Sequence, residues 1–374
     1  MTTATSRPTD PTAALPDQGP APGQFWAGIR TVALMELRQR VRTARWRLVL
    51  VAWAVVMYGI VALLWAATRN LDDAERGVVC YSVTIFLVLG LGMLVMPSLT
   101  GTSINGDREQ GVLAILQVTL LSPAQIVLGK LLAAWAVAGV FMLMSAPVLI
   151  VSLFYGGVDL GPLLLAVLTL VVVMTVVCAL GMMFSSLTAR TVTSVVLTYL
   201  AVGFLVFGTL ILFGVTTPLT EEEVTQRVQT WPVGGPDVAT DPSQERCVVV
   251  NRTVKQIRTD KTWWMLTLNP FVVVADAAPS KQSETRRALD PMGEISALAR
   301  LARRGPEPDR LIYECVDKAT PSFSNPSRND VAGVAPLWPV GLIGLALIGA
   351  GSIVVAIRRV RTPVHRLPAG TRIA

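Results

Sequence analysis

The sequence predicts an all-α polytopic membrane protein with six transmembrane helices. Of its 374 residues, 52 % are hydrophobic and only 15 % are charged. A soluble domain carries about 25 % charged residues. The mean hydropathy is +0.56, and the apolar residues are gathered into long runs. We therefore expect most of the chain to form helices within a bilayer.

Six segments are long and apolar enough to cross a bilayer as a helix, which takes about 20 apolar residues. They are residues 48–67, 78–99, 127–154, 162–184, 192–215 and 337–357. Because the number of spans is even, both termini are expected on the same side of the membrane.

Basic residues at both ends of the chain indicate which side that is. Residues 1–47 carry seven arginines against three acids, and residues 358–374 carry five arginines and no acid. Since basic residues beside spans mark the cytoplasmic side, we expect both termini there, as a disordered tail over 1–24 and a basic tail over 358–374. Nucleic-acid binding is the rival interpretation, but span flanks explain the charge without it.

Residues 25–47 predict an amphipathic helix that lies in the membrane interface. Apolar residues recur at every third or fourth position with arginines beside them, which is typical of an interfacial helix. The apolar positions are Trp26, Ile29, Ala33, Leu37 and Val41, and the basic ones are Arg38, Arg42 and Arg45.

The longest connection, residues 216–336, is predicted to form an extracytoplasmic domain. This assignment follows from the span count, because long loops are translocated largely regardless of their charge. Thr220 and Glu223 form a capping box that predicts a short helix. Asp290 and Pro291 predict the start of another helix, which Gly305 would end.

The four cysteines divide between the spans and this domain. Cys80 and Cys178 fall within spans, where we expect them to be packing residues. Cys247 and Cys315 both lie in the extracytoplasmic domain, and an oxidising compartment would favour a disulfide between them. Two free thiols are the alternative.

The apolar and aromatic segment 263–277 leaves two possibilities open. It is short, and Pro270 in its middle removes an amide donor and disfavours helix at Asn269. We therefore expect no seventh span here. The segment either dips into the outer leaflet as a hairpin or forms the core of the extracytoplasmic domain.

The spans lack the residues that several kinds of chemistry require. Apart from Lys130 at the cytoplasmic mouth of the third span, their cores hold no Asp, Glu, Arg, His or Lys. Ion-coupled transporters place ionisable groups there. The chain has no GxxxxGK[ST] sequence for ATP. The single histidine, His365, lies in the basic tail, so we expect neither a zinc site nor a cofactor.

The stretch 104–125 between the second and third spans is neither a span nor a tight turn. Asp107 is expected to cap a short helix, with Gln110 three residues on. Val112, Ile115 and Leu116 would share one apolar face of that helix.

A second helix is predicted to start directly after this one and to continue into the third span. Ser122, Pro123 and Gln125 form a capping box with proline at its favoured place. Lys130 is expected to snorkel to the cytoplasmic interface. In the alternative interpretation the first helix rests on lipid, for which Leu113, Ile115 and Leu116 are suited.

Residues 107–132, DREQGVLAILQVTLLSPAQIVLGKLL, resemble a pattern of ABC type-2 exporter permeases, E-R-E-x-G-T-L-E-x-L-x-x-T-P-L-S after the second span. This sequence departs from the pattern at Asp107, Val112 and Leu120. The matching positions are Arg108, Glu109, Gly111, Leu113, Leu116, Thr119, Leu121 and Ser122, followed by a Gly-Lys pair at Gly129 and Lys130.

The resemblance implies a non-catalytic permease subunit of a bacterial ABC exporter in the cell membrane. Two permeases, identical or different, would form the pathway, and separate ABC ATPase subunits would hydrolyse ATP. An ion-coupled secondary transporter and a membrane-anchored sensor or scaffold are the alternatives. The residues implied to couple the permease to the ATPase are Asp107, Arg108, Glu109, Gly111, Val112, Ile115, Leu116, Thr119, Ser122 and Pro123.

Overall fold

The computed structural model describes residues 22–112, 121–230, 248–278, 290–306, 312–313 and 333–361. Within these residues it contains six helices long and apolar enough to cross a membrane, which confirms the predicted spans. Spans 1 to 4 are α2 (Ala44–Ala67), α3 (Asp73–Thr100), α6 (Pro123–Phe154) and α7 (Leu160–Leu187). Span 5 comprises α8 (Thr191–Gly203), the π-helix η1 (Phe204–Gly208) and α9 (Thr209–Thr216), and span 6 is α12 (Trp338–Val360).

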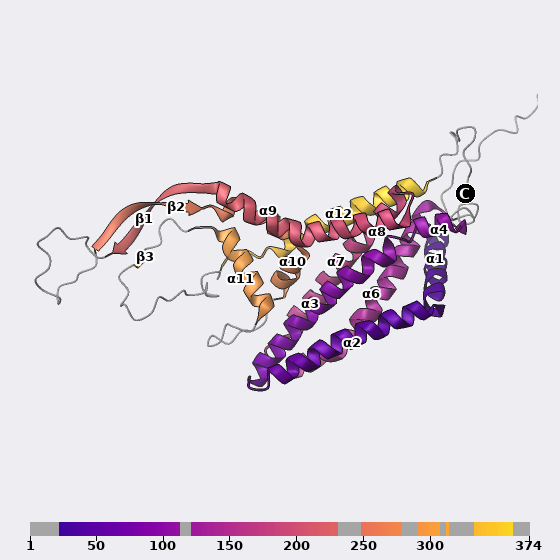
Figure 1. The fold of residues 1–374 in the computed structure, drawn as a ribbon, viewed down its shortest axis with the longest axis horizontal. Helices are drawn as coiled ribbons and strands as arrows, with labels where there is room; N and C mark the ends of the chain where they lie inside the picture. The colour runs from indigo at the N-terminus through magenta and orange to yellow at the C-terminus, as the bar shows by residue number, and fades with distance from the viewer. Residues whose placement is uncertain are drawn as a thin grey trace, which may run out of the picture.

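The spans form an elongated bundle with α7 at its centre, packed against α3, α6 and α12. The most apolar windows of α3 and α7 are each 61 % buried, whereas that of α2 is 11 % buried. Helix α2 therefore lies at the edge of the bundle (Figure 1). Trp53 is one of its few buried residues, and its ring stacks on Phe141 of α6 with ring centroids 4.1 Å apart.

Figure 1 also shows that the bundle has two distinct ends. We call the end at which α1 (Pro22–Arg42) and α4 (Asn105–Glu109) lie the α1 end. We call the opposite side, from which the strands project, the ribbon end.

Helix α1 lies where the amphipathic helix was predicted but ends at Arg42 rather than at residue 47, and its placement in the membrane interface stays a prediction. It packs against α6 through Ile29, Val32 and Ala33, all at most 3 % exposed. Gly129 permits this approach, because a Cβ at that position would lie 2.6 Å from the Cβ of Val32. Other predicted positions do not share this burial: Leu37 is half-buried, whereas Trp26, Val41, Arg38 and Arg42 are exposed. The side chain of Arg45 lies outside the described residues.

The predicted helix after Thr220 is wrong, because residues 221–230 form a strand. Strand β1 (Glu221–Thr230) pairs antiparallel with β2 (Val248–Ile257), from Glu221 opposite Ile257 to Thr230 opposite Val248. The two-residue strand β3 (Ile312–Tyr313) adds to β1 in parallel. The mostly helical class holds for the membrane part, and the ribbon is its exception.

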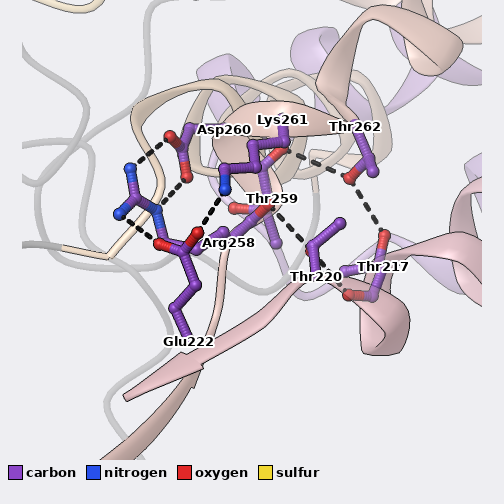
Figure 2. Close-up of polar contacts among 8 residues, drawn as sticks. All are labelled: Thr217, Thr220, Glu222, Arg258, Thr259, Asp260, Lys261 and Thr262. Atoms are coloured by element: carbon purple, nitrogen blue, oxygen red, sulfur yellow. Dashed lines mark hydrogen bonds and ion pairs between the residues drawn. The ribbon is translucent and has the colours of Figure 1, made fainter. Parts of the chain in front are cut away.

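A network of charges closes the base of this ribbon (Figure 2). Arg258 donates to both oxygens of Asp260 at 2.9 Å and to Glu222 Oε2 at 2.9 Å. Lys261 pairs with the other oxygen of Glu222. These hydrogen bonds, from Lys261 to Glu222 and from Arg258 to Asp260, hold the pKa of each carboxyl below its usual range.

Threonines join the same base to the end of span 5. The hydroxyls of Thr217 and Thr262 lie 3.1 Å apart. Thr220 donates its hydroxyl to the Arg258 carbonyl at 3.1 Å. Figure 2 shows these contacts beside the charged network, so the ribbon is anchored at its base, and β1 and β2 project away from the spans (Figure 1).

Segment 263–277 forms two short helical elements rather than a hairpin. Residues Trp263–Leu268 are a 3₁₀-helix, η5, and Pro270–Ala277 form α10. Asn269 caps α10 by accepting from the amides of Phe271 and Val272. Helix α10 packs on α7 and α12, and Val273 and Val274 belong to the main core of the spans. Val272 and Leu266 of the same segment belong to a second core, which includes Ala299 and Ala302 of α11. The segment therefore contributes to both cores.

Helix α11 (Pro291–Arg304) confirms the helix predicted after Asp290, and it packs against α10. Gly305 ends it with φ +69°, a left-handed conformation that favours glycine. Cys80 and Cys178 are buried and free. Cys247 and Cys315 lie outside the described residues.

Buried polar groups tie α10 and α11 to three spans, in an arrangement that we call the outer junction (Asn269, Asp276, Asp290 and their partners). Asp276, fully buried, accepts the amides of Leu337 and Trp338 at the start of α12, at 2.5 and 2.9 Å. Its other oxygen accepts from Ser296 and Arg300 of α11, at 2.9 and 2.6 Å. A carboxylate thereby satisfies orphan amides at the positive end of a helix.

The other two members of the outer junction reach spans 5 and 2. The side-chain amide of Asn269 donates to the Val206 carbonyl in η1 at 2.7 Å and to the Thr209 hydroxyl at 3.0 Å. Ser82 of α3 donates to Asp290 at 2.8 Å. Helices α10 and α11 are therefore bonded directly to the spans, and the extracytoplasmic domain over 216–336 stays a prediction.

Candidate functional site

Helix α4 follows α3 after one turn and begins differently from the prediction. Its N-cap is Ile104, and Asp107 lies inside the helix rather than capping it. Gly111 adopts φ +70° just after the helix ends. A side chain is strained in that conformation, so glycine is suited to this turn.

The start of α4 is fastened to the α7–α8 connection. The Ser185 hydroxyl accepts from the backbone amides of Ile104 and Asn105, both at 3.0 Å. The Asn105 side chain, fully buried, donates to Thr188 Oγ1 at 3.0 Å. These contacts hold α4 against the end of span 4.

Asp107 points the other way, into a buried charge cluster that we call the Lys130 cluster (Glu36, Arg40, Asp107 and Lys130). Lys130 Nζ lies 2.6 Å from Asp107 Oδ2 and also pairs with Glu36 Oε1. Arg40 lies 3.8 Å from the other oxygen of Glu36. The cluster joins α1, α4 and α6, and its formal charges cancel.

The prediction that Lys130 snorkels to the interface is wrong. Its side chain is only 1 % exposed. A buried ammonium is tolerated when its charge is paired and its protons are bonded. The two carboxylates from α1 and α4 supply those partners, so Lys130 stays within the protein.

The predicted capping box at the start of α6 is confirmed. Ser122 Oγ accepts from the Gln125 amide at 3.3 Å, and Gln125 Oε1 accepts from the Ser122 amide at 2.7 Å, with Pro123 in the first turn. The Gln125 amide group also donates to the carbonyls of Gln24 and Phe25 at 3.2 Å. The same box therefore secures α1 as well as α6.

The remaining predicted coupling residues divide into two groups. Arg108 and Val112 are half-buried and Glu109 is exposed. Glu109 Oε1 accepts weakly from the Thr191 amide at 3.4 Å. Arg108 makes no side-chain hydrogen bond or ion pair with another residue in the described ranges. Ile115, Leu116 and Thr119 lie outside the residues that the structure describes.

Sequence patterns did not predict the contacts of Glu36, Asn105 and Ser185 that hold α4 and its partners in the bundle. Glu36 carried a signal, since it is an acid seven residues after Ile29 in an otherwise basic helix. Asn105 and Ser185 carried none, because neither type stands out in sequence. Among the described residues no group of three or more His, Cys, Asp or Glu side chains could hold a metal ion.

Comparison with known families extends this picture. A family model described as ABC-2 family transporter protein matches residues 53–230, which run from α2 to the end of β1 and include α4. No protein among the curated sequences matches the chain. Together with the six spans, this match supports a multi-pass membrane permease of the ABC-2 transporter type.

Proposed function

We propose that this chain is the permease subunit of a bacterial ABC exporter, with both termini in the cytoplasm. A second permease would complete the translocation pathway. A separate ABC ATPase subunit would bind at the α1 end and contact α4 through Arg108, Glu109 and Val112. Hydrolysis would take place in that partner, because the chain has no phosphate-binding loop.

The observation that carries this proposal is the way α4 is fastened. Asp107 connects it to Lys130 of α6 and through Lys130 to Glu36 of α1. Ser185 connects it to α7. A displacement of α4 would therefore be passed to spans 2, 3 and 4 through buried bonds.

The exposed side of α4 supports a partner of mixed character. Arg108 and Glu109 offer a cation and an anion at the surface, with Val112 beside them. Charged hydrogen bonds at a docked contact contribute about 1.5–3 kcal/mol each. A helix that only rests on lipid would not need three buried attachments to the bundle.

Ion-coupled transport is the weaker candidate. Such carriers hold ionisable groups within their spans. The buried charges of the Lys130 cluster lie at the α1 end and already neutralise one another. They bind the helices together and offer no net charge to a coupling ion.

The test uses the permease co-expressed with its ATPase subunit, with Glu109→Ala and Arg108→Ala as variants. Because these side chains lie outside the core, the variants should insert normally. They should retain at least tenfold less ATPase subunit or lose the stimulation of hydrolysis by the permease. Asp72→Ala, exposed at the start of α3, is the matched control. Variants that behave like this control would show that α4 is not the coupling contact.

A second measurement separates the assignment from the contact. The purified permease alone should not hydrolyse ATP. Specific turnover by the isolated chain, free of contaminating ATPases, would contradict the non-catalytic role whatever α4 does.

A further inference from the structure

A groove of about 710 Å³ opens at the ribbon end between span 5 and α11. One wall is formed by Leu210 and Phe213 of α9, and the other by Leu298 and its neighbours on α11. Val272 of α10 lines the groove between them. Its size and apolar lining fall within the range of small-molecule sites.

The wall formed by α9 indicates whether the groove opens to lipid or to water. Leu210 and Phe213 belong to a helix that is long and apolar enough to span the membrane. Leu210 is 46 % exposed and Leu298 is 55 % exposed, so apolar side chains on both walls remain uncovered by the protein. A groove with a membrane-spanning wall is open to the bilayer rather than only to water.

Tryptophans indicate the depth of the groove. Trp263 and Trp264 lie in η5, and Trp338 begins span 6. Tryptophan is enriched at the boundary between acyl chains and headgroups. Trp264 is half exposed. The groove therefore lies where the acyl chain and the headgroup of one lipid could both be reached.

A cation lies at the end of the groove. Arg304, the last residue of α11, is among its lining residues. A guanidinium matches the geometry of a phosphate and binds it with paired hydrogen bonds. The nearby carboxylate of Asp260 is engaged by two bonds from Arg258. This carboxylate lies beside Gly305, where a Cβ would be 2.7 Å from Oδ1, and its charge is offset by Arg258.

We propose that this groove is a binding site for one membrane phospholipid. The acyl chain lies between Leu210 and Leu298, and the phosphate lies beside Arg304. The groove shares no residue with the proposed ATPase contact at the α1 end, so either inference can fail without the other.

The test counts the phospholipids that stay with the purified chain. The protein is reconstituted with dioleoyl phosphatidylglycerol, transferred to mild detergent and weighed by native mass spectrometry. The parent should retain one more lipid per chain than Leu298→Trp, which fills the groove. Leu212→Trp, on α9 but not in the lining, should match the parent.

Two further variants keep the test decisive. Ile257→Trp closes the groove from the strand side and replaces Leu298→Trp if that variant does not fold. Arg304→Ala should lower the retention of phosphatidylglycerol relative to uncharged diacylglycerol by at least threefold. Equal lipid counts in parent and filled variants would overturn the proposal. A filled variant that changes the oligomeric state but not the lipid count would assign the groove to a second copy instead.

Discussion

At each end of the bundle, helices that do not span the membrane are held against the spans by buried polar side chains, but the two ends use different partners. At the α1 end, Lys130 is held by two carboxylates from other helices. At the ribbon end, Asp276 is held mainly by neutral donors and by one arginine. At the α1 end, opposite charges neutralise one another. At the ribbon end, a carboxylate accepts hydrogen bonds from the first amides of α12.

This difference determines what each end can tolerate. A charge cluster fails when any one member is removed, because the remaining charges stay buried and unpaired. A carboxylate that accepts from neutral amides can lose one hydrogen bond and keep the others. The exposed network at the base of the ribbon forms a third case, since water and salt can replace every contact.

Lys130→Met should give the largest loss of stability. It leaves Asp107 without its cation and Glu36 with only Arg40, and breaking a buried pair costs about 3–5 kcal/mol. The measurement is thermal unfolding of the purified chain in detergent, followed by tryptophan fluorescence. The triple variant with Glu36→Gln and Asp107→Asn removes every charge of the cluster except that of the partly exposed Arg40, and it should recover much of the loss. No recovery would show that charge balance is not what Lys130 supplies.

Asp276→Asn should give the next largest loss of stability, and the loss should arise at the ribbon end. Both oxygens of Asp276 accept hydrogen bonds, so the NH₂ group of asparagine would face a donor at one of the two positions. This clash costs about 2 kcal/mol. The same unfolding assay measures it. Asp72→Asn is the control, since its side chain makes no capping hydrogen bond. It should change stability by less than about 0.5 kcal/mol. An equal effect in both would argue against the outer junction.

Ser122→Ala should have a smaller effect, confined to the α1 end. Losing the cap of α6 costs about 1 kcal/mol. Because Gln125 also binds α1, hydrogen exchange should increase over residues 24–30 before the rest of the chain responds. Ser98→Ala, exposed inside α3, should leave that exchange unchanged.

The smallest effect should be the response of the ribbon base to pH. Glu222 and Asp260 have lowered pKa values in the folded chain, so their contribution is full above the ordinary carboxyl range near pH 4. It is lost as the pH falls through the lowered values. Hydrogen exchange of β1 and β2, corrected for its intrinsic pH dependence, should therefore be constant from pH 7 to 5 and faster below about pH 4. Glu222→Gln should weaken that step, and an unchanged step would assign it elsewhere.

Local patterns predicted several elements of this fold well. Long apolar runs located all six spans, since nothing else in a chain accounts for 20 apolar residues in sequence. The Ser122 box and the helix from Pro291 to Gly305 were also predicted, because capping depends on residues three or four apart.

Contacts between distant residues could not be predicted in the same way. Glu36, Asp107 and Lys130 meet only through the packing of three helices, and no local pattern pairs them. Thr220 and Glu223 fit a capping box, yet pairing with β2 and the bonds of Glu222 to Arg258 favour a strand. Asp276 was overlooked because its partners lie 20 to 62 residues away.

Span 5 contains one turn that is wound differently from the rest. In η1 the Thr209 amide bonds to the Phe204 carbonyl, five residues back, and Asn269 takes up the Val206 carbonyl. A π-turn holds one residue more than an α-turn, and each residue rotates a helix by about 100°. Because the wider turn absorbs its extra residue, deleting one residue here would convert it into an α-turn and leave Leu210 and Phe213 on the side of α11. Deleting one residue from α8 instead would rotate both away from α11, so the phase of α9 depends on the number of residues before it.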